Sequence, residues 1–439
     1  MNFSRWLVTA SLLALLLGCN QKTSVKKTGY YAGSQACREC HQEQHLGWLA
    51  TQHPYKLQEA TASTVIGDFS TSNTYEAGGV TTRMSVKDGK FYIETACGAD
   101  NAIKTFQVKY VIGGLWKQRY ITEFENGALM ILPVQWNIKL SAWADYHGLK
   151  TRKPGSGKYW SDPVRAYQFG CMGCHTTGGT YSYDTSSKCF TKTRWAEQGI
   201  GCEACHGPGA LHAAADEFDK RKHILHPDRL PDKRKAAMVC GYCHTRGKDK
   251  TKKHGYPTRG IEKNGDIETV KMFEPGDNML FTFDPGPGVH PDGSAMRHRQ
   301  QYDDWLQSKH YEVGVMCWDC HNPHREDGRH EHAELREKGS ALCLSCHKNV
   351  ASKGIHGLHD VNSCIGCHMP STAKSANPYD IHGHTLKVIM PKVSIEKGGV
   401  EKQPNACTLC HYHKDDKLEE LQAIVDRVIA EKKGLKPTR

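Results

Sequence analysis

Cysteine and histidine are the residues whose spacing in this sequence points most directly to chemistry. Sixteen of the 19 cysteines form eight pairs with two residues between the members, and a histidine follows every pair. Two thiols three positions apart lie on one side of a helical turn, where they can add to the two vinyl groups of one porphyrin, and the adjacent imidazole then reaches the iron. The pattern therefore predicts eight covalently bound c-type haems, each with a proximal histidine. From the first to the eighth, the motifs are Cys37-Cys40-His41, Cys171-Cys174-His175, Cys202-Cys205-His206, Cys240-Cys243-His244, Cys317-Cys320-His321, Cys343-Cys346-His347, Cys364-Cys367-His368 and Cys407-Cys410-His411.

Zinc sites and disulfides are the other common uses of paired cysteines. Neither needs a histidine after the second cysteine, whereas here the histidine is present in all eight motifs. Cys97 and Cys189 lie outside the motifs. These two either form a disulfide or are unrelated thiols, and sequence alone does not choose between the alternatives because it carries no geometry.

A six-coordinate haem iron needs a second axial ligand, usually another histidine. We expect a histidine near a motif to bind a neighbouring haem, because its own haem already has a proximal ligand. The predicted distal ligands are His53, His212, His310, His324, His356, His359, His382 and His384. The histidines held in reserve are His147, His254, His290 and His298, and those expected at the surface are His45, His223, His226, His330, His332 and His413. The histidines outside the motifs outnumber the eight distal positions. Their number therefore gives no reason to expect an iron that lacks a distal ligand.

The N-terminus has the pattern of an export signal. Arg5 precedes a twelve-residue apolar run at positions 6–17, which suits a signal peptide better than a membrane span. Leu16-Leu17-Gly18-Cys19 resembles a bacterial lipobox, which implies cleavage after residue 18 and a lipid on the Cys19 sulfur. The alternative is a plain signal peptide with an incidental cysteine. Asn20 differs from the aspartate associated with inner-membrane retention, so the resemblance favours the outer membrane, on its periplasmic or cell-surface face.

The composition suits a protein whose interior is partly cofactor. Only 38% of the 439 residues are hydrophobic and the mean hydropathy is -0.62, so a conventional core would be hard to fill. The formal net charge of +11 could also suit nucleic acid or an anionic membrane. Each haem carries two propionates, however, and we interpret the excess lysine and arginine as their partners, with no role for nucleic acid.

Eight haems in a chain of this length must lie close together, with few residues around each haem. We therefore predict a mainly α fold with long loops, a haem-stacked multihaem cytochrome c with a small β insert. The insert should contain a hairpin over 84–95 that turns at Lys87-Asp88-Gly89, and strands over 106–112 and 128–134. Residues 247–298 are predicted to be irregular, 300–310 helical and 415–433 an amphipathic helix. The predicted segments are a signal peptide (1–18), a tether (19–30), a first haem segment (31–59), the β insert (60–145), a seven-haem domain (146–413) and a C-terminal helix (414–439).

Several stretches resemble multihaem c-type cytochromes related to the tetrahaem electron acceptor of hydroxylamine oxidoreductase. The similarity is strongest at residues 201–212, Gly-Cys-Glu-Ala-Cys-His-Gly-Pro-Gly-Ala-Leu-His. It also covers residues 33–48, 111–114, 134–136, 317–324, 364–370 and 404–411. The resemblance implies electron transfer through haems that mostly have two histidine ligands, although some relatives keep one open, catalytic iron.

Taken together, the residues favour a lipid-anchored electron carrier of anaerobic respiration. Its expected partners are other multihaem cytochromes or a porin conduit. One alternative is a reductase of a small nitrogen or sulfur oxyanion with one open haem. The other is a self-associating subunit of an extracellular cytochrome filament.

Overall fold

The structure is a computed structural model, and it describes residues 30–70, 73–146, 149–324, 334–350, 356, 363–410 and 412–433. Several sequence-based predictions fall elsewhere. The signal peptide, Cys19, nearly all of the tether, His147, His330, His332, His359 and His411 lie outside the described residues.

The predicted mainly α fold is wrong, because helix makes up 27% and strand 25% of the structure. Most helices are only one turn long. The helices are α1 Ser34–Cys37, α2 Gln42–Leu49, α3 Tyr167–Gly170, α4 Met172–His175, α5 Glu203–His206, α6 Ala210–Ala214, α7 Lys233–His244, α8 Gln301–Trp305, α9 Lys309–Glu312, α10 Cys317–Cys320, α11 Ser340–Leu344, α12 Cys364–His368, α13 Pro391–Glu396 and α14 Leu418–Lys432. Short 3₁₀ turns are η1 Pro54–Lys56, η2 Pro163–Arg165, η3 Lys220–His223, η4 Pro227–Arg229 and η5 Met279–Phe281.

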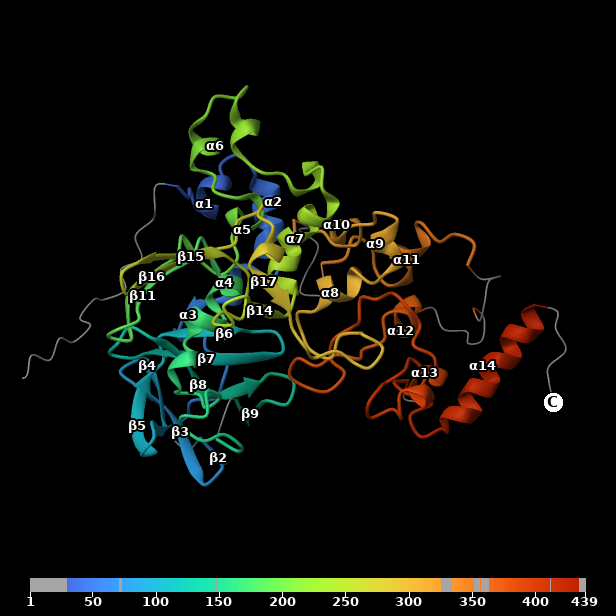
Figure 1. Ribbon diagram of the computed structural model, residues 1–439, viewed down its shortest axis with the longest axis horizontal. Helices are drawn as coiled ribbons and strands as arrows, with labels where there is room; N and C mark the ends of the chain where they lie inside the picture. The colour runs from blue at the N-terminus through green and yellow to red at the C-terminus, as the bar shows by residue number, and fades with distance from the viewer. Residues whose placement is uncertain are drawn as a thin grey trace, which may run out of the picture.

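Two antiparallel sheets fill the region between the first and second motifs (lower left in Figure 1). One has the order β2-β3-β4-β5 and the other β1-β6-β7-β8-β9. The strands are β1 Gln58–Glu59, β2 Thr74–Ala77, β3 Val80–Lys87, β4 Lys90–Cys97, β5 Ala102–Gln107, β6 Tyr110–Gly113, β7 Lys117–Glu123, β8 Leu129–Asn137 and β9 Ala142–Asp145. The predicted β3–β4 hairpin is confirmed, and its turn residues Asp88 and Gly89 have φ of 49° and 69°, as a type I′ turn requires.

The predicted strand over 106–112 is instead two strands in different sheets. The Val108 N–H donates to the Phe91 carbonyl in one sheet, and the next N–H, of Lys109, donates to the Ile121 carbonyl in the other. The chain therefore crosses between the sheets at these two residues, which a continuous apolar pattern does not reveal.

A conventional hydrophobic core lies between these sheets and extends to the second motif. It includes Ile93, Tyr120, Leu132, Trp160 and Tyr167, each at most 1% exposed. The low overall hydrophobicity misled the prediction because the apolar residues are concentrated in this part of the chain. The second motif consequently rests on a side-chain core, through α3 and α4.

The segment 247–298 is not wholly irregular, so that prediction is wrong. It contains a hairpin, β15 Thr258–Asn264 and β16 Ile267–Met272, in the sheet order β12-β11-β16-β15. The remaining strands are β10 Thr176–Thr177, β11 Thr180–Asp184, β12 Cys189–Arg194, β13 Glu197–Gln198, β14 Gly247–Asp249 and β17 Phe283–Pro285.

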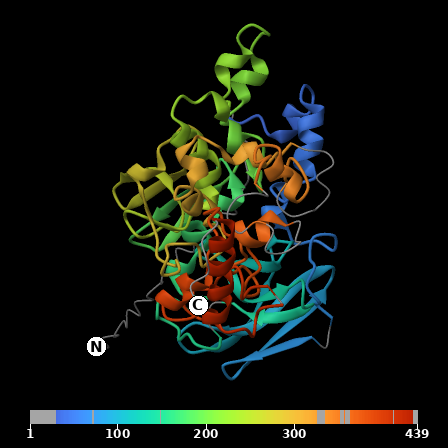
Figure 2. The same ribbon diagram turned by 90° about the vertical axis from the view of Figure 1, so that its right-hand side faces the viewer.

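The later motifs lie on short helices on the other side of the molecule from the two β-rich sheets (Figure 1). The predicted helix over 300–310 is broken into α8 and α9 between Trp305 and Lys309. The predicted C-terminal helix is confirmed as α14, which buries Leu421 and Val425 and packs on α13. It stands in front of the molecule in Figure 2. None of the described helices is long and apolar enough to span a membrane.

Candidate haem sites

One continuous cavity of about 4330 Å³ runs through the molecule, and all sixteen motif cysteines line it. Cavities for single small ligands measure roughly 300–1,000 Å³. A space many times larger, edged throughout by paired cysteines, has the form required by several haems in contact. The donor set therefore fits covalently bound haem.

The motifs have the local geometry that thioether attachment needs. The N–H of the motif histidine donates to the carbonyl of the first motif cysteine at 2.9 Å for His41, 3.0 Å for His206 and 2.9 Å for His321. This i to i−4 bond closes one helical turn, which places both sulfurs on one side.

Five motif histidines face a second histidine ring across the cavity. The pairs are His41 with His212 at 6.2 Å between ring centres, His206 with His324 at 5.9 Å, His347 with His310 at 6.0 Å, His321 with His384 at 6.3 Å and His368 with His356 at 5.9 Å. A histidine nitrogen binds a metal at about 2 Å and lies about 1 Å from its ring centre, so two histidines on opposite sides of one iron have ring centres about 6 Å apart. The five pairs have this spacing.

Backbone carbonyls orient several of these rings through Nδ1. His206 Nδ1 lies 3.0 Å from the Leu225 carbonyl, His175 Nδ1 2.9 Å from that of Lys56, and His212 Nδ1 2.8 Å from that of Lys220. A hydrogen bond from Nδ1 leaves Nε2 free for iron, which is the usual arrangement of metal-bound histidine. Burial, the largest cause, lowers the pKa of His53, His175 and His244 to about 4, so the rings are in the neutral form that binds metal.

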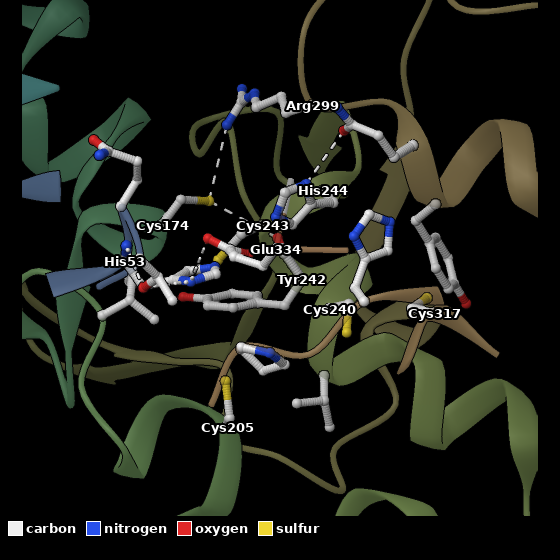
Figure 3. A pocket seen from close by; sticks show the side chains of 18 of the residues that line it. His53, Cys174, Cys205, Cys240, Tyr242, Cys243, His244, Arg299, Cys317 and Glu334 are labelled. Atoms are coloured by element: carbon white, nitrogen blue, oxygen red, sulfur yellow. Dashed lines mark hydrogen bonds and ion pairs between the residues drawn. The ribbon is translucent and has the colours of Figure 1, made fainter. Parts of the chain in front are cut away.

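The other candidate ligands have different surroundings. His53 lines the same cavity as His244 of the fourth motif and lies 3.9 Å from a Glu334 oxygen (Figure 3). His382 lines the cavity, with Nδ1 2.6 Å from the Met369 carbonyl. His175 faces the ring of Tyr167 at 6.4 Å, and within the described part of the chain no histidine ring pairs with it.

Two reserve histidines have both ring nitrogens engaged by protein. His290 lies 3.2 Å from the Lys402 carbonyl and 3.1 Å from that of Thr372. His254 is fully buried between Tyr181 and Asp249. His45, predicted at the surface, is only 6% exposed and packs on Trp48, so that prediction is wrong.

A buried carboxylate ties the first motif to the third. Glu203 lies between Cys202 and Cys205 and is 2% exposed. It accepts N–H groups of Ala32 at 2.8 Å, Gly33 at 2.8 Å and Gly209 at 2.6 Å. The segment that begins the first motif is thereby held against the third, although their residues are far apart in sequence.

Sequence analysis missed a group of cations beside the second motif, which we call the cationic cluster. Its members are Lys117, Arg119, Arg246, Arg297, Arg299 and Lys374, all lining the cavity. None of the six makes an ion pair within 4.0 Å with a carboxylate of the described residues. Arg299 Nη1 lies 3.9 Å from Cys174 Sγ (Figure 3), and the Arg119 guanidinium stacks 3.8 Å from the Tyr146 ring centre. Only the run Arg297-His298-Arg299 could have drawn attention to it, since the cations come from four separate segments.

Mutual repulsion and burial perturb these groups. Burial, then Arg119, lowers the pKa of Lys117 to about 7, and burial, then Arg299, lowers that of Arg246 to about 10. Burial and the surrounding cations also hold the pKa of His298 well below its usual value. Such a cluster favours a bound anion, because an anion would relieve the repulsion.

Cys97 and Cys189 do not pair with each other. Cys97 is a buried free thiol, which rules out the disulfide between Cys97 and Cys189.

Comparison with known proteins agrees with this geometry. Residues 310–352 match the doubled CXXCH motif, and residues 142–207 match the cytochrome c554 and c-prime family. The chain is a multihaem c-type cytochrome. Its CXXCH motifs bind haem covalently, and such proteins act in electron transport.

Two curated relatives are reductases. The cytochrome is 23% identical over 176 residues to the cytochrome c nitrite reductase subunit NrfA of Nitratidesulfovibrio vulgaris, covering 34% of this chain and 33% of the relative. It is 27% identical over 206 residues to the dissimilatory sulfite reductase MccA of Wolinella succinogenes, covering 42% of this chain and 24% of the relative. The matches therefore span a third or less of either relative's length.

The fold itself is shared with a solved structure, the outer cell wall cytochrome OcwA. The two superpose with a TM-score of 0.62 at 21% identity, over 91% of this chain and 86% of OcwA. The combination of β-rich sheets with haem-bearing short helices is thus an established architecture.

Proposed function

We propose that this cytochrome is an octahaem electron carrier. Each of the eight motifs holds one haem, and electrons pass from haem to haem between a periplasmic donor and an acceptor outside the cytoplasm. The observation that carries the proposal is the set of five histidine pairs about 6 Å apart. An iron with two histidine ligands offers no site to a substrate, so its role is to gain and lose electrons.

The same geometry supports a ligand assignment. The proposed distal ligands are His212 for the first motif, His324 for the third, His53 for the fourth, His384 for the fifth, His310 for the sixth and His356 for the seventh. His382 and His359 are the candidates for the two remaining irons.

The proposed location is the outer membrane, through a lipid on Cys19 after removal of residues 1–18. The lipobox-like sequence at 16–19 supports it. The proposed partners are other multihaem cytochromes or a porin conduit. The resemblance to relatives of the hydroxylamine oxidoreductase electron acceptor supports a place in a periplasmic electron-transfer chain. The alternative is that the protein associates with further copies of itself into a filament.

Spin state and film voltammetry together test the carrier function. The purified holoprotein should exchange electrons reversibly with an electrode, and nearly all ferric iron should give low-spin signals in electron paramagnetic resonance. His384→Ala should add a single high-spin haem, while His226→Ala, which removes a ring whose side chain is 52% exposed, should add none. A holoprotein dominated by high-spin iron would contradict the proposal.

A second candidate function is reduction of a small nitrogen or sulfur oxyanion at the second motif. Two observations favour it: no described histidine ring pairs with His175, and the cationic cluster lies beside that motif. Arg119, Arg299 and Tyr146 would bind and orient the anion, and Tyr146 could donate a proton. The two relatives described above, a nitrite reductase subunit and a sulfite reductase, agree with this chemistry.

Nitrite and sulfite titrations distinguish this candidate from the carrier function alone. A native high-spin haem whose spectrum shifts on adding either anion supports it. Arg119→Gln should weaken that shift, whereas Arg83→Gln, an exposed arginine paired with Glu94, should leave it unchanged. If neither anion alters the spectrum, the cationic cluster serves haem propionates and the reductase is excluded.

A further inference from the structure

One end of the molecule carries an excursion between α5 and α7, comprising residues 207–232. It contains α6 and the turns η3 and η4, and it projects from the same end in both views (Figures 1 and 2). Within it lies Phe218, which is 94% exposed, the highest value among the large hydrophobic residues of the described chain. Phe218 is also absent from the lining of the haem cavity, so a bound haem does not cover it. Neither the haem sites nor the hydrophobic core accounts for this ring.

Hydrogen bonds hold the turn that carries Phe218. The Asp216 carboxylate accepts the N–H groups of Phe218 and Asp219, both at 3.1 Å. The Asp216 carbonyl accepts the N–H of Lys220 at 3.0 Å. The ring is thus presented by an ordered turn, and little further ordering is needed for it to bind. Preorganisation of this kind is typical of an interaction site, because it lowers the entropic cost of binding.

Phe218 belongs to a group of exposed apolar side chains, which we call the apolar end. Its members, with their exposed fractions, are Phe218 (94%), Leu211 (65%), Tyr30 (53%), Leu46 (43%) and Leu49 (36%). The Ala210 N–H lies 3.4 Å from the Tyr30 carbonyl, so the chain that leads into the first motif runs beside α6. Leu46 and Leu49 are three residues apart on α2, hence on one face of that helix, and α2 lies at the same end of the molecule as α6 (Figures 1 and 2). Exposed apolar residues that gather in one region indicate a binding surface, whereas isolated ones do not.

The charge at this end is positive. The acidic side chains next to the exposed ring are already paired: Glu217 lies 3.4 Å from Lys220, and Asp219 makes an ion pair with Lys222. Arg221, between these two lysines, is exposed and has no carboxylate within 4.0 Å among the residues that the structure describes. A free cation beside exposed apolar side chains suits a surface that is apolar inside and negatively charged outside.

The chain between Cys19 and Tyr30 adds to this positive charge. It contains Lys22, Lys26 and Lys27 and no acidic residue. Tyr30 follows Cys19 by eleven residues, which span at most about 40 Å when fully extended. A lipid on Cys19 would therefore keep Tyr30, and α6 beside it, within that distance of the bilayer. The apolar end is thus the part of the described molecule that the proposed anchor brings to the membrane.

We infer that the apolar end is a membrane-contact face, with which the folded protein rests on a bilayer that contains anionic phospholipid. Phe218 and its apolar neighbours enter the boundary between headgroups and acyl chains, and Arg221 lies against the headgroup phosphates. α14, on the other side of the molecule, then faces away from the bilayer (Figure 1). The inference rests on the proposed lipid at Cys19, which directs this end to the membrane, and it does not depend on the electron-carrier function.

Thiol modification of the lipidated holoprotein tests this face. Phe218→Cys places one new thiol in the apolar end, and Asp415→Cys places a control thiol just before α14, at a side chain that is 86% exposed. Each variant is reconstituted into vesicles of phosphatidylethanolamine and phosphatidylglycerol, and a protease site inserted after Thr23 later releases the protein from its lipid. On the vesicles, Phe218→Cys should react with a charged maleimide about tenfold more slowly than Asp415→Cys, because the interface excludes the reagent. After release and removal of the vesicles, the two should react equally fast.

Sedimentation of the released holoprotein with the same vesicles is the second measurement. Phe218→Ser should lower the ratio of bound to free protein about tenfold, as the loss of a buried aromatic side chain implies. Val313→Ser is the matched control and should leave the ratio unchanged, because Val313 is 75% exposed but lies at the end of α9, away from α6 (Figure 1). Arg221→Gln should weaken binding to these vesicles and leave binding to vesicles of phosphatidylcholine alone unchanged.

The outcomes separate the membrane-contact face from the lipid anchor. If Phe218→Cys reacts as fast as Asp415→Cys while the protein stays on the vesicles, or if Phe218→Ser binds as well as the parent, the inference is wrong and the anchor stands. If the protein leaves the vesicles before cleavage and carries no lipid, the proposed anchor is contradicted and the inference fails with it. If the Phe218→Cys thiol stays protected after release, a second copy of the chain covers it, and the membrane-contact face is excluded.

Discussion

At the scale of single residues, His206 shows how two histidines at one distance can be told apart. The rings of His324 and His226 both lie 5.9 Å from that of His206. The His206 Nδ1 bonds to the carbonyl of Leu225, so the neighbouring His226 is on the Nδ1 side and His324 is left for the iron at Nε2. His324→Ala should therefore create one new high-spin haem, and the control His226→Ala should create none. Electron paramagnetic resonance of the two variant holoproteins measures the high-spin haem. A new high-spin haem in His226→Ala, and none in His324→Ala, would show that His226 is the distal ligand.

The proximal half of each site was predictable because its three residues are contiguous and share one helical turn. The distal half was not, because its residues come from remote segments: His212 meets His41, and His384 meets His321. Closeness in sequence to a motif singled out the candidate distal histidines, but it could not tell which haem each of them faces. The cationic cluster was even less visible, since a lysine or arginine has no characteristic spacing.

At the scale of elements, the sequence predicted local turns better than pairings. Asp88-Gly89 marked one hairpin correctly. The β15–β16 hairpin has a similar turn signal, Gly265-Asp266, with Gly265 at φ 58°. The residues on either side of the turn are largely charged, and for that reason the sequence analysis predicted a loop here. The sheet around this hairpin depends on the pairing of β16 with β11. Ser182 of β11 and Thr269 of β16, whose hydroxyls hydrogen-bond across this pair, are 87 residues apart in sequence, and only tertiary contacts specify such a pairing.

Glu203 provides an element-scale prediction, since it holds the first motif's segment against the third motif. Glu203→Ala would leave three N–H groups without their acceptor, which should cost about 1–3 kcal/mol in the free energy of unfolding for each buried group that stays unsatisfied. Thermal unfolding should show the loss, and limited proteolysis should find the segment around Ala32 more accessible. Glu94→Ala is the control, because its ion pair with Arg83 is exposed and worth little. Equal stability of the two variants would contradict the tie.

At the scale of the whole molecule, the eight motifs predict the composition of the mature protein. Its intact mass should exceed that of the processed polypeptide by eight haems plus lipid. The haems should also lower the isoelectric point below the sequence value of 8.8, because their propionates offset the net charge of +11. Mass spectrometry and isoelectric focusing of the holoprotein check both expectations. Seven or fewer haems in fully matured protein would contradict the count.

Membrane attachment is the last whole-molecule property that a single residue should control. If Cys19 carries the lipid, Cys19→Ala should block processing or release the protein from the outer-membrane fraction, because a lipobox needs its cysteine for both cleavage and acylation. Asn20→Asp is the matched change next to it. It should leave lipid attachment intact and move the protein towards the inner membrane. Membrane fractionation with mass analysis of the N-terminal peptide reads out both variants. Normal cleavage and normal outer-membrane fractionation of Cys19→Ala would show that the apolar run is a plain signal peptide and that another part of the molecule makes the attachment.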